Sequence, residues 1–135
     1  MREIKFRAWD KRKKQFISWE EIKRNTSMNL FGGYWELFNR NEFVPIQYTG
    51  IKDKNNKEIY EGDILRLYIP ANDEIAEVEV FWDELQLRWA TRYVKSPAII
   101  DGNKSYTLPL CAFIHKKAEI IGNIYENPEL IKETK

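Results

Sequence analysis

Residues 76–89 read AEVEVFWDELQLRW, the most regular stretch of the sequence. Apolar side chains occupy every second position on both sides of Asp83 and Glu84, which is the period of a strand with one buried face. The pattern predicts a β-hairpin whose two-residue turn is Asp83 and Glu84. In this hairpin we expect Val78 and Leu87 to face the core.

Alternating or apolar stretches elsewhere predict further strands, separated by polar turns. These strands are expected at residues 3–9, 44–48, 65–69 and 118–125, with a short hairpin arm at residues 16–17. A short helix is expected to start at Trp19, because Ser18 and Glu21 have the spacing of a capping box. In the polar turn at residues 52–58, Asn55 or Asn56 is expected to take a positive φ.

Because helices are too few to cover a parallel sheet, these elements predict a mainly β fold. We expect a small SH3-like barrel or half-barrel with an N-terminal β-hairpin and a short helix packed on it. At 135 residues the chain fits one domain. Residues 1–46 would form the hairpin, the helix and an aromatic-rich segment, and residues 47–135 the barrel-like part.

Composition narrows the function classes. The chain has 22 basic and 21 acidic residues and a net charge of +1, which is too balanced for long-range attraction to nucleic acid. Cys111 is the one cysteine and His115 the one histidine, so an internal disulfide and a Cys-based zinc site are excluded. The N-terminus lacks the apolar run of a signal peptide, and no stretch is long enough to span a membrane. We therefore expect a cytoplasmic protein with no membrane partner and no cofactor.

Three blocks carry a family resemblance: REIKFRAWD at 2–10, QYTGIKDKNNKEIYEGDI at 47–64 and EIIGNIYENPEL at 119–130. In this order they resemble the YopX family of phage and prophage proteins. The resemblance implies a mainly β protein of the bacterial cytoplasm, with no established enzymatic activity or cofactor. The family usually has Gly where this chain has Asn56, and Asn also tolerates a positive φ.

An aromatic segment is the first candidate binding site. Trp and Tyr concentrate binding energy at protein interfaces, and small sheets with open edges often pair with a second copy. The segment at residues 30–43 is predicted to form either a hairpin or a loop that packs on the rest of the protein. Its aromatic side chains are predicted to be either a protein contact or part of the core. The candidate contact residues are Phe31, Tyr34, Trp35 and Phe38.

A basic run is the second candidate. Lysines beside aromatic rings suit a single-stranded nucleic acid, whose phosphates bind cations and whose bases stack on the rings. The same lysines also suit a solvated hairpin tip. The candidate nucleic-acid contacts are Lys11, Arg12, Lys13, Lys14 and Trp9.

Catalytic alternatives are less specific. Asp53, Glu58, Glu61 and Asp63 could bind a divalent ion in a metal-dependent hydrolase, or they could simply shape a turn. Cys111 and His115 would meet only on a helix, since on a strand they would lie about 13 Å apart. Together with the phage or prophage origin that the resemblance implies, the sequence therefore favours a non-enzymatic accessory protein that acts through protein contacts, including self-association. Nucleic-acid binding and hydrolysis are the alternatives.

Overall fold

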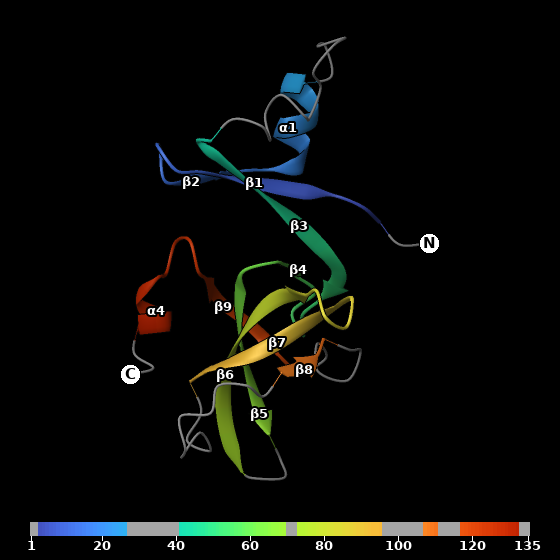
Figure 1. The fold of residues 1–135 in the computed structure, drawn as a ribbon, viewed down its shortest axis with the longest axis vertical. Helices are drawn as coiled ribbons and strands as arrows, with labels where there is room; N and C mark the ends of the chain where they lie inside the picture. The colour runs from blue at the N-terminus through green and yellow to red at the C-terminus, as the bar shows by residue number, and fades with distance from the viewer. Residues whose placement is uncertain (1–2, 27–40, 70–72, 96–106, 111–116, 133–135) are drawn as a thin grey trace. The chain divides into compact units, whose positions relative to one another are not determined.

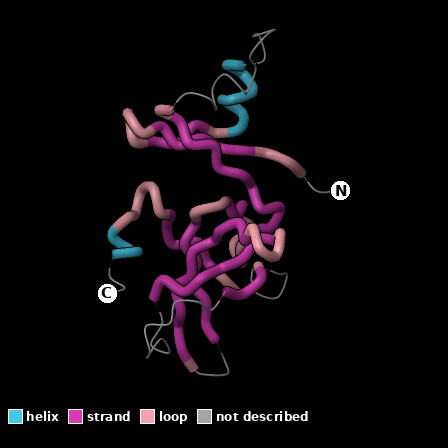
Figure 2. The backbone as a smooth tube through the Cα atoms, in the orientation of Figure 1, coloured by secondary structure: helices cyan, strands magenta, loops and turns pink. Residues whose placement is uncertain are grey.

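The computed structural model describes residues 3–26, 41–69, 73–95, 107–110 and 117–132. Strands make up most of these residues (Figure 2). The chain divides into two compact units, Met1–Tyr48 (unit 1) and Thr49–Lys135 (unit 2). Figure 1 labels the helices and strands of both units.

Unit 1 contains a β-hairpin followed by a helix. Its elements are β1 (Phe6–Asp10), β2 (Gln15–Ile17), α1 (Trp19–Thr26) and the first part of β3 (Phe43–Lys52). Strand β1 pairs antiparallel with β2 on one side and with β3 on the other. The predicted hairpin and the predicted helix start at Trp19 are confirmed.

Helix α1 begins with the expected cap and packs on β1. The Glu21 N–H donates to Ser18 Oγ at 3.2 Å, which satisfies one of the N–H groups that a helix start leaves without a partner. The Trp19 ring lies 6.0 Å from the Phe6 ring, and Ile22 is buried. One face of the helix therefore closes over the hairpin.

Unit 2 is built around a five-stranded antiparallel sheet with the order β8-β7-β6-β5-β9 (Figure 1). Its strands are β5 (Asp63–Ile69), β6 (Glu74–Asp83), β7 (Arg88–Lys95), β8 (Thr107–Pro109) and β9 (Glu119–Asn123). Strand β4 (Glu58–Tyr60) is next to β3 in a second sheet, and α4 (Glu129–Lys132) follows β9. The mainly β fold and the half-barrel are confirmed. The SH3-like assignment stays a prediction.

The core of unit 2 follows the predicted alternation. In β5, Leu65 and Leu67 are buried whereas Arg66 and Tyr68 are exposed. The buried cluster draws on strands and loops of unit 2: Ile59, Leu65, Leu67, Val78, Val80, Leu110 and Ala118. Burial of these side chains is the main favourable term in the stability of the unit.

The turn predicted at Asp83 and Glu84 is wrong. Strand β6 continues to Asp83, which pairs with Arg88, so the turn is residues 84–87. Leu85 is 96% exposed and Leu87 is 73% exposed, contrary to the expectation that Leu87 faces the core. A two-residue turn needs positive φ at its central positions and favours Asn or Gly there, which neither residue supplies. Asp83 instead accepts backbone N–H groups from the longer turn.

Other predicted elements are present with shifted ends. Strand β3 is longer than predicted, because it runs on to Lys52, and β9 is shorter than the predicted strand at residues 118–125. Asn56 has φ 65°, which confirms the positive φ expected in that turn. The aromatic segment falls mostly in residues 27–40, outside the described residues.

Candidate functional site

Asp53, the first carboxylate of the candidate acidic group, is bound to the backbone. Its Oδ1 accepts the N–H groups of Asn55 at 2.8 Å and Lys57 at 2.9 Å. Its Oδ2 accepts the Ile120 N–H at 3.0 Å, from a residue far along the chain. A buried carboxylate with three N–H donors is well satisfied, so Asp53 ties the turn at residues 53–57 to β9.

Asp63 has a similar role one turn later. It is buried, and its Oδ2 accepts the Tyr60 N–H at 2.8 Å. Gly62 lies between Tyr60 and Asp63 and has φ 87°. A Cβ on Gly62 would lie 2.9 Å from the Tyr125 ring. The Gly62 carbonyl accepts the Ile124 N–H at 2.9 Å. This turn is therefore shaped to receive the chain that follows β9.

Glu61, another carboxylate of the candidate acidic group, is half-buried. Partial burial raises its pKa, and the negative charge of Glu79 raises it further. Glu79 itself accepts from Arg92 Nη2 at 2.9 Å. In the described part of the chain, no three His, Cys, Asp or Glu side chains are grouped closely enough to bind a metal ion.

The segment after β9 is held by side-chain amides. Asn123 Oδ1 accepts the N–H groups of Tyr125 at 3.0 Å and Glu126 at 2.8 Å. A Cβ on Gly122 would lie 2.5 Å from Asn127 Oδ1, so this position needs glycine while the turn stays in place. The blocks at 47–64 and 119–130 thus contain residues that join distant parts of unit 2. These contacts give the residues a structural role.

Strand β9 is at one edge of the five-stranded sheet, and side chains and a turn occupy that edge. The Ile120 N–H donates to Asp53, the Asn123 N–H donates to Asn127 Oδ1 at 3.2 Å, and the Ala118 carbonyl accepts the Lys54 N–H at 3.0 Å. Groups used in this way are not available to a strand from another molecule. Pairing of a second copy along β9 therefore has no support from this geometry.

An exposed apolar surface lies at the turn between β6 and β7. We call Trp82, Leu85 and Leu87 the apolar tip. Trp82 is 37% exposed, and its ring meets that of its cross-strand partner Trp89 edge-on, with centroids 5.2 Å apart. Sequence reasoning missed this surface because it placed Leu87 in a strand; the missed signal is the absence of Gly or Asn for a two-residue turn.

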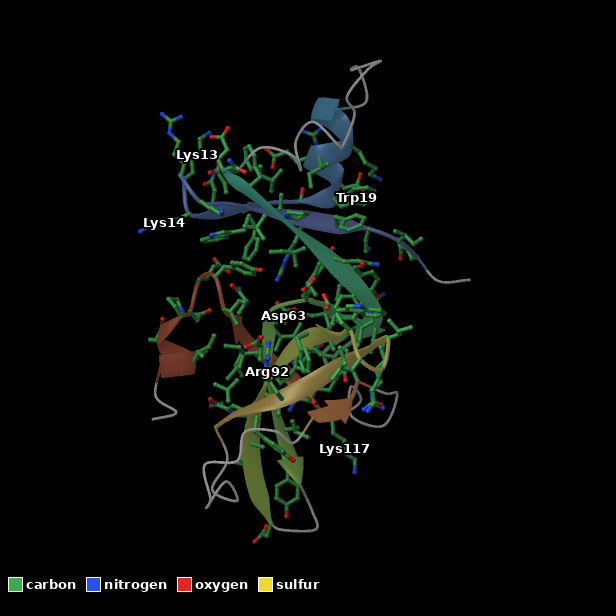
Figure 3. The ribbon with its side chains drawn as sticks, in the orientation of Figure 1. Lys13, Lys14, Trp19, Asp63, Arg92 and Lys117 are labelled. Carbon is green, nitrogen blue, oxygen red and sulfur yellow. The ribbon has the colours of Figure 1, made fainter. Side chains whose placement is uncertain are left out.

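The basic residues predicted as nucleic-acid contacts form the turn between β1 and β2. We call Lys11, Arg12, Lys13 and Lys14 the basic tip, and all four side chains are exposed. Figure 3 shows Lys13 and Lys14 at the end of this hairpin.

Trp9 differs from the other candidate nucleic-acid contacts, because it is only 8% exposed. Its ring meets the Phe16 ring edge-on at 4.8 Å, and the Arg7 guanidinium lies 4.2 Å from that Phe16 ring. Little of the Trp9 ring is left for a base to stack on.

Other candidates lie outside the described residues. These are the aromatic residues Phe31, Tyr34, Trp35 and Phe38, together with Cys111 and His115. Neither helix in the described ranges has the length and apolar character that a membrane span requires.

Comparisons with known proteins agree with this fold. The chain is similar to the crystal structure of protein EF1440 from Enterococcus faecalis, with a TM-score of 0.56 and 22% identity over 97% of this chain and 99% of that chain. At this identity the similarity shows a shared fold. No curated protein matches the chain. The sequence model described as YopX protein matches residues 5–132, which confirms the resemblance of the three blocks. The chain therefore belongs to the YopX protein family.

Proposed function

We propose that this protein is a phage or prophage accessory protein of the bacterial cytoplasm that acts by binding proteins, including a second copy of itself, and does not catalyse a reaction. Membership of the YopX family supports the phage or prophage origin. The observation that carries the proposed binding function is the apolar tip, where Leu85 is 96% exposed and Leu87 is 73% exposed. Large apolar side chains exposed together on a turn favour contact with another protein surface.

The candidate acidic group supports the non-catalytic part of the proposal. Asp53 and Asp63 both accept backbone N–H groups, and their carboxylates stabilise turns. A general base or a metal ligand needs a carboxylate oxygen directed at a substrate or an ion. The two best-placed acids of the candidate hydrolase site already have structural partners.

The size of the apolar tip sets the affinity to expect. Complete burial of one leucine side chain contributes about 1.5–3 kcal/mol, and association costs several kcal/mol before any affinity remains. Two leucines and part of a tryptophan therefore suit a weak complex, with a Kd in the micromolar range or weaker. The partner to test first is a second copy of the chain, because dimers with two-fold symmetry are the commonest oligomers of soluble proteins.

Sedimentation of the full chain at high micromolar concentration tests self-association. The wild-type protein should show a mass above that of the monomer, and the double variant L85Q/L87Q should return to the monomer mass. The matched control is I75Q, because Ile75 is also an exposed aliphatic residue of β6 at the other end of the strand. A wild-type protein that stays monomeric would refute self-association, and equal loss in I75Q would refute the apolar tip as the contact.

A further inference from the structure

The basic tip concentrates positive charge on one short turn. Its four residues follow one another without interruption and are all exposed. Within the described residues, no ion pair neutralises any of them. If Asp10 and Glu42, which contact the turn through hydrogen bonds, are both counted, four positive and two negative charges leave a local charge of +2. The local charge therefore exceeds the net charge of +1 on the whole chain.

The backbone of the basic tip is fixed by Asp10. Asp10 is buried, and its Oδ1 accepts the N–H groups of Arg12 at 2.9 Å and Lys13 at 3.0 Å. Its carbonyl accepts the Lys14 N–H at 2.7 Å, and the Lys11 N–H donates to the Glu42 carbonyl at 2.9 Å. The carboxylate of Asp10 thus binds backbone groups, and the four cationic side chains extend from a held turn.

The chemistry of this surface matches phosphate groups. Lys and Arg side chains bind the phosphates of nucleic acids, and a two-stranded β-hairpin is narrow enough to enter the major groove of a duplex. The basic tip has no apolar side chain to insert into a lipid bilayer. The ring of Trp9 is buried, which leaves little of it for the base stacking that single-strand binding uses.

We propose that the basic tip binds double-stranded DNA through its phosphates, without reading base sequence. Contacts made by lysines and an arginine to phosphates position a protein on DNA and carry no sequence information of their own. Because the whole chain is nearly neutral, the attraction is short-ranged and operates at low salt. This inference is independent of the apolar tip, so the variant L85Q should bind DNA as the wild type does.

Fluorescence anisotropy with the full chain and a labelled random duplex of about 24 base pairs tests this inference. If all four cations contact phosphates, log K should fall with log salt at a slope of about −3.6, so that a fourfold rise in salt weakens binding about 150-fold. The double variant K13Q/K14Q should lower the magnitude of the slope by about 1.8. Both side chains are exposed, so the variant should fold, and circular dichroism verifies this.

The matched control is K57Q/K117Q, which removes two exposed positive charges in unit 2 and should leave the slope unchanged. Equal weakening by both double variants would show that overall charge alone drives binding and would overturn the inference. Binding that does not depend on salt would also overturn it. So would tighter binding to a single strand of equal length, or binding to phosphatidylserine vesicles without binding to the duplex.

Discussion

The two hairpin tips share a backbone arrangement and differ in their surfaces. In each, four residues connect the strands, and an aspartate just before them accepts two backbone N–H groups through Oδ1. The aspartates are Asp10 and Asp83, and the fourth turn residue has a positive φ, 53° at Lys14 and 54° at Leu87. One turn presents cations and the other presents leucines such as Leu85. The backbone therefore depends on the aspartate, while the connecting residues can vary in chemistry.

The largest expected effect is on the free energy of unfolding, which should differ between a substitution in strand β6 and one in the apolar tip. V78D places a charge at a side chain that is 1% exposed, which we expect to destabilise the protein by more than about 3 kcal/mol. L87D changes a side chain in the exposed turn and should alter stability by less than about 0.5 kcal/mol. Urea unfolding measures both changes. Equal destabilisation by the two variants would mean that Leu87 is a core residue after all.

Removal of each aspartate compares the two turns directly. D10A should destabilise by about 1–3 kcal/mol, because it leaves two N–H groups without an acceptor near a buried position. D83A should cost less, about 0.5–1.5 kcal/mol, because its turn is exposed and water can replace the acceptor. Thermal unfolding of the two variants gives the comparison. A larger loss in D83A than in D10A would contradict this order.

Glycine at the fourth turn position should stabilise both hairpins by similar amounts. A residue other than glycine at a positive φ carries a cost of about 1 kcal/mol, so K14G and L87G should each gain a few tenths to about 1 kcal/mol. The greater freedom of glycine in the unfolded chain offsets part of the gain. Denaturant midpoints measured in parallel test this equivalence. Opposite signs for the two variants would show that the two backbones are not alike.

The smallest expected effect is a pH dependence of the free energy of unfolding, which comes from Glu61 beside strand β6. The pKa of Glu61 is raised by partial burial and by Glu79 on β6, so folding disfavours its ionised form. The penalty applies fully above the raised pKa and disappears as pH falls towards the ordinary value of 4.5. E61Q should therefore be slightly more stable than wild type near pH 8, with a smaller difference near pH 5. Urea titrations at both pH values test the sign, and a wild-type advantage near pH 8 would contradict it.

The sequence predicted the first turn better than the second for a physical reason. Four consecutive cations cannot be mistaken for a half-buried strand, so the first turn was placed between the correct strands. In the second turn, Leu85 and Leu87 alternate with polar residues and imitate a strand. Periodicity alone cannot show that an aspartate side chain will end the strand at Asp83, because that depends on turn geometry.

Side-chain contacts between residues far apart in the chain could also not be predicted from the sequence. The polar turn at residues 52–58 was correctly predicted, but nothing in its spacing shows that Asp53 accepts the Ile120 N–H. Likewise, the basic tip was located in full, whereas the burial of Trp9 depends on its packing against Phe16. Candidate surfaces can thus be found from composition and spacing, and their availability is decided by packing.

Exchange of the turn residues tests most directly the claim that the two tips differ only in surface chemistry. In the variant E84K/L85R/Q86K/L87K, the second turn takes the residues of the first and keeps Asp83. We predict a folded protein whose unfolding midpoint is close to that of the wild type, whose sedimentation is monomeric at high micromolar concentration, and whose DNA binding depends more steeply on salt. An unfolded variant, or one that self-associates as the wild type does, would contradict the claim.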